Sequence, residues 1–229
     1  MTQTSHNGFV EKYRFWLVFL FAAVLLQLPF ISIPFKWFES YFHEISHGLA
    51  AIITGGSIVK IELFPNGAGL CTTIGGSRFV TSFMGYAGAA IWGTLLYASS
   101  GYHKRAAQIV HILVALLLVC SLVFWVRDVL TFVIVGFLLA IIVLKFKFSS
   151  ATYLQFSMQV LGALVLINSI YSPLYLLAYH QQGDSATLAQ LTMLPELIWI
   201  AIWFSIGVGC MVYLAKTSKT NSSQATAVK

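Results

Sequence analysis

Two histidines and a glutamate stand together in an apolar stretch, in the run Phe42-His43-Glu44-Ile45-Ser46-His47-Gly48. In an α-helix, residues four positions apart share one face, so His43 and His47 can bind one zinc ion. Glu44, beside them, can accept a proton from water as a catalytic base. The run predicts the chemistry of a zinc hydrolase. The alternative is two structural histidines in a helix bundle, which is costly because the buried glutamate then lacks a neutralising partner.

The predicted zinc site needs a third ligand, because catalytic zinc usually has three protein ligands and an open position for water. We expect a carboxylate in this role. The chain has seven acidic residues, Glu44 among them, and its two aspartates are Asp128 and Asp184. Residue type alone leaves the choice open.

The elements that must position these residues are membrane helices. Hydrophobic residues make up 59% of the chain and charged residues only 9%, which excludes an ordinary soluble domain. A further helix over residues 38–54 carries the two histidines and either spans the bilayer or re-enters it. We therefore expect an all-α polytopic membrane protein with six spanning helices and this additional helix. The apolar segments long enough to span are 15–35, 79–99, 106–126, 129–144, 153–178 and 194–214.

The chain divides into a polar N-terminal tail (1–14), a membrane-embedded domain (15–215) and a disordered polar tail (216–229). The first apolar segment lacks a small-x-small cleavage site, so we expect a retained anchor and no signal peptide. The net charge of +6 comes from scattered basic residues, which indicates topology signals and no nucleic-acid partner. The three cysteines are expected to be buried thiols.

Two β-rich runs, 57–64 and 70–74, flank the turn Pro65-Asn66-Gly67-Ala68-Gly69 and predict a small β-hairpin. An open strand edge cannot face lipid, so the hairpin must lie at the interface or line a cavity beside the active site. We expect an extended substrate peptide to pair with this edge, with Val59 and Ile61 as substrate-binding residues. The alternative is a small interfacial loop without a partner.

These features together resemble the site-2-type intramembrane zinc metalloproteases, and specifically their B-like branch. The similarity runs from about residue 37 to residue 203, and the domain 15–215 is then metalloprotease-like. It rests on His43 to Ala51 with the hairpin, Gly85-Tyr86-Ala87-Gly88, Val126-Arg127-Asp128 and the run from Gly183 to Thr192.

The resemblance implies that Asp184 is the third zinc ligand. Family members typically read Ser-Asp-Ala where this chain has Gly183-Asp184-Ser185, whereas they vary between Asp and Asn at the position of Asp128. Each aspartate also has a structural alternative, because Asp is a favoured helix cap. Asn168 is a candidate for binding the substrate backbone or an oxyanion, with a hydrogen bond between helices as its alternative.

The resemblance further implies a metallopeptidase with one zinc ion that cuts membrane-protein substrates in or near their transmembrane segments. We expect a multi-pass protein of the bacterial cytoplasmic (inner) membrane, with the lipid bilayer as its surroundings; the sequence carries no signal for an oligomeric state. Two other functions stay open. One is an ion or proton transporter that uses the intramembrane His, Glu and Asp residues. The other is an inactive relative that binds membrane segments without cutting them.

Overall fold

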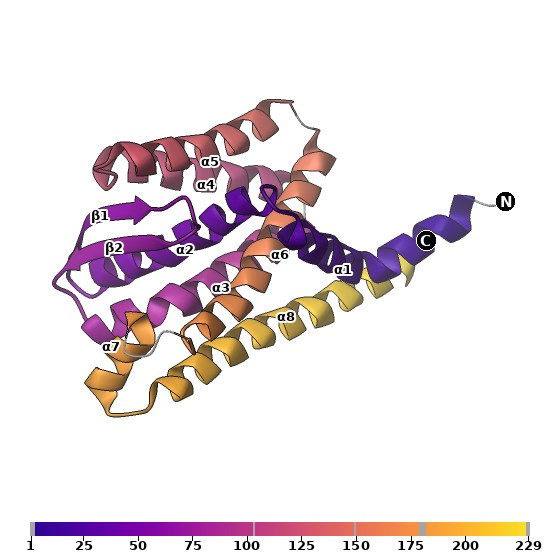
Figure 1. The fold of residues 1–229 in the computed structure, drawn as a ribbon. Coiled ribbons are helices and arrows are strands. Elements are labelled where there is room, and N and C mark those ends of the chain that lie inside the picture. Colours follow the sequence, from indigo (N-terminus) through magenta and orange to yellow (C-terminus); the bar gives the residue numbers. More distant parts are fainter. Residues whose placement is uncertain (1–2, 103, 149, 179–181, 228–229) are drawn as a thin grey trace.

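The computed structural model describes residues 3–102, 104–148, 150–178 and 182–227, which form eight α-helices and one two-stranded antiparallel sheet (Figure 1). The elements in chain order are α1 Gln3–Gln27, α2 Ser32–Ile53, β1 Ser57–Leu63, β2 Gly69–Ile74, α3 Arg78–Tyr102, α4 Lys104–Phe124, α5 Val129–Phe148, α6 Ala151–Tyr175, α7 Gly183–Thr192 and α8 Glu196–Ala227. Helices α1 and α8 thus extend into both predicted tails. The division into tails and a domain stays a prediction.

Five of the helices, α3 to α6 and α8, are each long and apolar enough to cross a membrane. Helices α1 and α2 pass the same test only as a pair, bent by 107°, which fits a broken span or a re-entrant loop. Within the described residues there are therefore five candidate spans, or six with the bent pair. The protein is a multi-pass membrane protein, as its composition predicted.

The single span predicted for residues 15–35 is wrong, because the chain turns sharply between α1 and α2. Pro29 has no N–H to continue the helical hydrogen bonds. Phe30 follows with a φ of 63°, in the left-handed region that ends a right-handed helix. Helix α2 then begins at Ser32, and it contains the whole H-E-x-x-H run.

Helix α2 lies inside the molecule, between the hairpin and α3, with α6 also against it (Figure 1). Its aromatic side chains Tyr41 and Phe42 are fully buried and pack in one cluster with Ile61 of β1. A hydrogen bond of 2.8 Å joins the hydroxyls of Tyr41 and Ser121, which fixes α2 to α4. The helix that carries the histidines is thus held on several sides.

Helices α3 and α6 cross at a pair of glycines. A Cβ on Gly93 would lie 2.7 Å from the backbone nitrogen of Leu166, and one on Gly162 would lie 2.5 Å from the nitrogen of Tyr97. Since van der Waals packing of close backbones drives helix association in membranes, these glycines are the means by which α3 and α6 meet.

The predicted hairpin is confirmed. Strands β1 and β2 pair antiparallel, with Ile61 opposite Cys71 and Leu63 opposite Gly69, and an irregularity in β1 falls at Val59. A φ of 88° at Gly67 in the connecting turn suits glycine.

The outer edge of β1 is not open to a peptide. The backbone N–H of Ile61 donates to the carbonyl of Trp125 at 2.9 Å, and that of Leu63 donates to the Thr131 hydroxyl at 3.0 Å. Trp125 belongs to the connection between α4 and α5, and Thr131 belongs to the first turn of α5. The assignment of Ile61 to substrate binding therefore needs correction: its N–H is engaged within the protein and its side chain is fully buried.

Candidate metal centre

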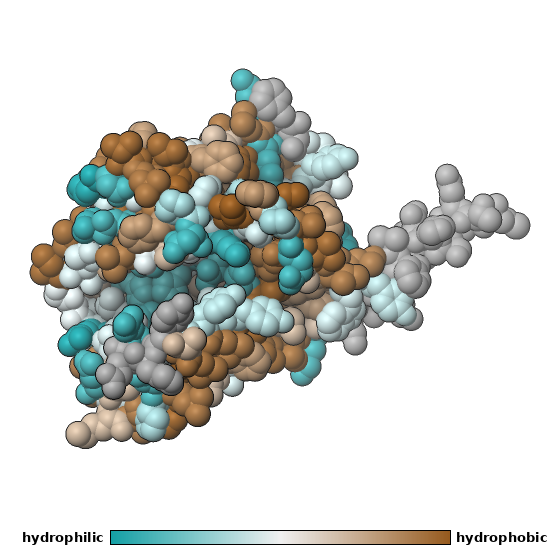
Figure 2. All heavy atoms as spheres, in the orientation of Figure 1, coloured by the Kyte–Doolittle hydropathy of each residue, from teal (hydrophilic) through white to brown (hydrophobic). Residues whose placement is uncertain are grey.

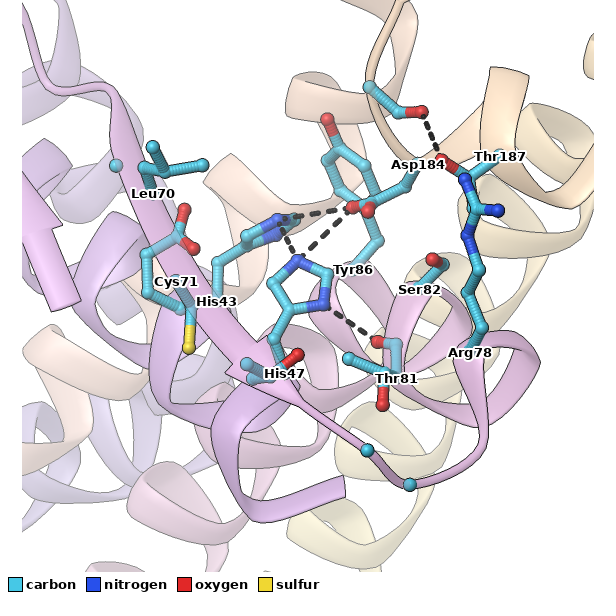
Figure 3. A pocket seen from close by; sticks show the side chains of 16 residues that line it. His43, His47, Leu70, Cys71, Arg78, Thr81, Ser82, Tyr86, Asp184 and Thr187 are labelled. Atoms are coloured by element: carbon cyan, nitrogen blue, oxygen red, sulfur yellow. Dashed lines mark hydrogen bonds and ion pairs between the residues drawn. The ribbon is translucent and has the colours of Figure 1, made fainter. Parts of the chain in front are cut away.

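Three potential metal ligands converge between α2 and α7 (Figure 3). The Nε2 atoms of His43 and His47 lie 3.0 Å apart, and each lies 3.3 Å from Oδ2 of Asp184. The histidines lie one turn apart on α2, and Asp184 is the second residue of α7. The structure thus brings together the three residues predicted as ligands, while their role in binding zinc stays a prediction.

The spacing of these atoms fits a zinc ion. In a tetrahedral site with zinc–nitrogen bonds of about 2.0 Å, neighbouring ligand atoms lie about 3.3 Å apart. The second ring nitrogen of His47 supports the same conclusion, because its Nδ1 lies 2.7 Å from the carbonyl oxygen of Thr81. A carbonyl only accepts hydrogen bonds, so Nδ1 carries a proton, and when the ring is neutral Nε2 has a lone pair for a metal.

Asp184 is held against the histidines by the packing of α7. Leu188 of α7 is fully buried in a cluster with Trp199 and Trp203 of α8, and the Ser185 hydroxyl donates to Glu196 at 2.9 Å. Burial by itself raises the pKa of the Asp184 carboxyl, but His47 and His43 in their protonated forms carry positive charge and donate hydrogen bonds to it, which outweighs burial and lowers this pKa below its ordinary value. The carboxylate is the form that binds a metal.

Strand β2 packs directly on Glu44, which is 5% exposed. The Glu44 carboxylate accepts a hydrogen bond from the backbone N–H of Cys71. A Cβ on Gly69 would lie 2.5 Å from Cγ of Glu44, so only glycine permits this approach. The hairpin thus fixes the predicted catalytic base.

Helix α3 approaches the histidines at a second pair of glycines. A Cβ on Gly85 would lie 2.4 Å from Nε2 of His47 and 2.7 Å from Cε1 of His43. A Cβ on Gly88 would lie 2.3 Å from the hydroxyl of Ser46. Gly85 and Gly88 lie on the face of α3 that contacts α2, and this contact leaves no room for larger side chains beside the ligands.

The ligand atoms and Glu44 open into one cavity of about 660 Å³. Figure 2 shows hydrophilic residues gathered in a recess between the hairpin and α7, with apolar residues around it. Tyr86 lines the cavity with its ring edge-on to His43, at a centroid distance of 4.4 Å. The cavity wall consists of His43, Glu44, His47, Gly69, Leu70, Cys71, Thr73, Gly75, Gly76, Arg78, Thr81, Ser82, Tyr86, Gly183, Asp184 and Thr187.

A family model described as Peptidase M50B-like matches residues 16–214. The chain belongs to this family. The match covers most of the chain and confirms the resemblance inferred from the H-E-x-x-H, glycine and aspartate motifs. No curated protein and no solved structure gives a significant match. Family membership supports a protease, and the M50B-like family is one of zinc metalloproteases.

The other predicted site residues of this M50B-like protein lie outside the cavity wall. Asp128 caps α5, because its Oδ1 accepts the backbone N–H of Thr131 at 2.8 Å. Val59 is 37% exposed at the irregularity of β1, and the side chain of Ile61, also on β1, is fully buried. Asn168 lies on α6 with its Nδ2 buried and without a hydrogen-bond partner among the described residues. The proposed contacts of Val59 and Asn168 with substrate stay untested, whereas that of Ile61 is corrected above.

Sequence reasoning missed several groups at this site. Thr81 contributes only a backbone carbonyl, which no side-chain pattern can reveal. Tyr86 stands in a motif that was recognised, yet its contact with His43 depends on the approach of α3. Arg78 looked like one of many scattered basic residues, and its place in the cavity wall comes from the short connection between β2 and α3.

We expect the substitution Asp184→Ala to lower zinc affinity about 100-fold or more, since loss of even a supporting residue at a metal site costs about 10- to 100-fold. Metal analysis of purified protein measures this. The matched control is Asp128→Ala, which should keep its zinc and lose about 1 kcal/mol of stability through the lost helix cap. Retention of zinc by the Asp184 variant, or its loss from the Asp128 variant, would contradict the assignment.

Proposed function

We propose that this protein is a zinc metalloendopeptidase that hydrolyses peptide bonds in or next to transmembrane segments of membrane proteins. The observation that carries the proposal is the convergence of His43, His47 and Asp184 at distances that suit zinc, with Glu44 in the wall of the same cavity. The family match favours this function over the ion transporter that the sequence left open.

The roles of the residues follow from their positions. Zinc held by His43, His47 and Asp184 would supply a Lewis acid that polarises the peptide carbonyl and makes water a nucleophile near neutral pH. Glu44 takes the proton of the attacking water and passes it to the leaving amine. The Thr81 carbonyl keeps the His47 ring in the tautomer and orientation that binding requires.

The substrate must be unwound locally, because the carbonyls of an α-helix are already hydrogen-bonded. We infer that the extended peptide pairs with the outer edge of β2, in place of the β1 edge that the sequence suggested. Cys71 is opposite Ile61, whose N–H points away from β2 to Trp125, so the N–H of Cys71 points away from β1. Because N–H groups alternate in direction along a strand, the N–H of Thr73 points the same way. Both residues line the cavity, and the Cys71 N–H already reaches Glu44. A peptide on this edge lies next to the base.

The substitution Glu44→Gln should preserve zinc binding and slow cleavage about 100- to 10,000-fold, the usual contribution of a general base. The measurement is cleavage of membrane-protein substrates by purified protein in liposomes, with zinc content determined on the same samples. Glu62→Gln is the matched control, because Glu62 pairs with Lys60 on β1 at 2.8 Å, away from the cavity. Unchanged cleavage by the Glu44 variant would remove this residue as the base. A parent protein that binds substrates without cutting them would be an inactive relative.

Pairing with β2 is tested at Thr73. Thr73→Pro removes the outward N–H at an edge position, where proline is tolerated, and should weaken peptide binding about 2- to 10-fold through one lost hydrogen bond. Thr73→Ala keeps the N–H and should bind as the parent does. Peptide affinity can be measured by fluorescence anisotropy. Equal affinities of the two variants would contradict pairing at β2.

A further inference from the structure

Arg78 is the one Lys or Arg residue in the described cavity wall, and its charge has no use in the mechanism above. The acids Glu44 and Asp184 in the same wall both have roles, whereas Arg78 forms no hydrogen bond or ion pair with the described part of the chain. Figure 3 shows its side chain rising from the start of α3 beside Ser82, and Thr187 of α7 lines the same cavity. A guanidinium in a cavity wall that is exposed and has no partner among the described residues can bind a ligand.

The local backbone adds to this positive charge. Arg78 is the first residue of α3, and the N-terminus of a long helix attracts anions through its free N–H groups and dipole. The planar guanidinium matches a carboxylate, with which it forms two parallel hydrogen bonds. The chemistry of this corner of the cavity therefore favours an anionic group.

The edge of β2 leads toward Arg78. Strand β2 ends at Ile74, and Gly75 and Gly76 line the cavity between that strand and the start of α3. These glycines put no side chain in the way. A peptide on the outer edge of β2, at about 3.3 Å per residue, therefore passes from Glu44 toward Arg78 within a few residues.

We propose that Arg78 determines substrate specificity by binding a carboxylate of the peptide, a few residues from the scissile bond on the side of the Gly75–Gly76 turn. This inference rests on the proposed function, because it requires a peptide in the cavity. The carboxylate is an Asp or Glu side chain, or the free C-terminus of the peptide. Lipid phosphate is the rival ligand, but the cavity shared with Glu44 and Asp184 favours the peptide.

The test measures peptide binding to the full chain with the Glu44→Gln substitution, in nanodiscs of zwitterionic lipid. The probes are fluorescent, C-terminally amidated transmembrane-segment peptides in which one Asp is moved along the sequence, with matched Asn and Lys peptides. A parallel set has a free C-terminal carboxylate and no Asp. We expect the peptide with Asp at one particular position to bind about tenfold more tightly than the matched Asn peptide. Alternatively, the peptide with a free C-terminal carboxylate should bind about tenfold more tightly than its amidated form.

Adding Arg78→Ala should abolish this preference, and adding Arg78→Glu should make Lys the preferred residue. The control is Arg105→Ala, because Arg105 is also exposed in the first turn of a spanning helix, α4, but lies outside the cavity wall; this variant should keep the preference. A preference that survives Arg78→Ala, or no preference in any peptide, overturns the inference. The same measurements are repeated in nanodiscs that contain anionic lipid. If Arg78→Ala changes the binding of all peptides equally, and only in these nanodiscs, Arg78 binds lipid and the inference is also overturned.

Cleavage by the protein with Glu44 intact separates this inference from the proposed function. If that protein cuts the Asn peptide but binding shows no effect of charge, the inference on Arg78 is wrong and the peptidase stands. If binding shows the charge preference but no peptide is cut in the presence of zinc, the peptidase is wrong and the anion subsite stands.

Discussion

The structure depends on the contact between two imidazoles of α2 and one carboxylate at the start of α7. A buried carboxylate is expensive in a membrane protein, and when both rings are neutral with their protons on Nδ1, the lone pairs of the three facing atoms, 3.0–3.3 Å apart, repel one another. A cation among them turns this cost into an attraction. The Thr81 carbonyl accepts a hydrogen bond from Nδ1–H of His47, so in the neutral ring the nitrogen that faces Asp184 has a lone pair to offer. Metal binding is therefore the simplest way to satisfy all the groups together.

The rest of the fold serves the close approach that this contact requires. Helix α3 reaches the histidines because Gly85 has no side chain, and β2 reaches Glu44 because Gly69 has none. The hairpin has two unequal edges. Its β1 edge is fixed to the α4–α5 connection through Ile61 and Trp125, whereas β2 faces the cavity. One strand thus holds the hairpin in place, and the other positions the base and lines the cavity.

Features that depend on neighbouring residues could be predicted from the sequence, whereas contacts between distant parts of the chain could not. The spacing of the histidines and the Pro-Asn-Gly turn specified a helix face and a hairpin, because both depend on neighbouring residues. Pro29 was visible too, yet the apolar run continued across it and hid the sharp turn. The carbonyls of Trp125 and Thr81 carry no sequence signal, and Asp184 was chosen through the family resemblance. The position of Arg78 required the path of the chain after β2.

The central claim is that zinc binds at His43, His47 and Asp184. X-ray absorption spectroscopy at the zinc edge of the purified protein tests it most directly. We expect one zinc per chain, with two imidazole nitrogens at about 2.0–2.1 Å and carboxylate or water oxygen at about 2.0–2.2 Å. Protein that binds no zinc, or zinc with a sulfur ligand at about 2.3 Å, which would indicate Cys71, would contradict it.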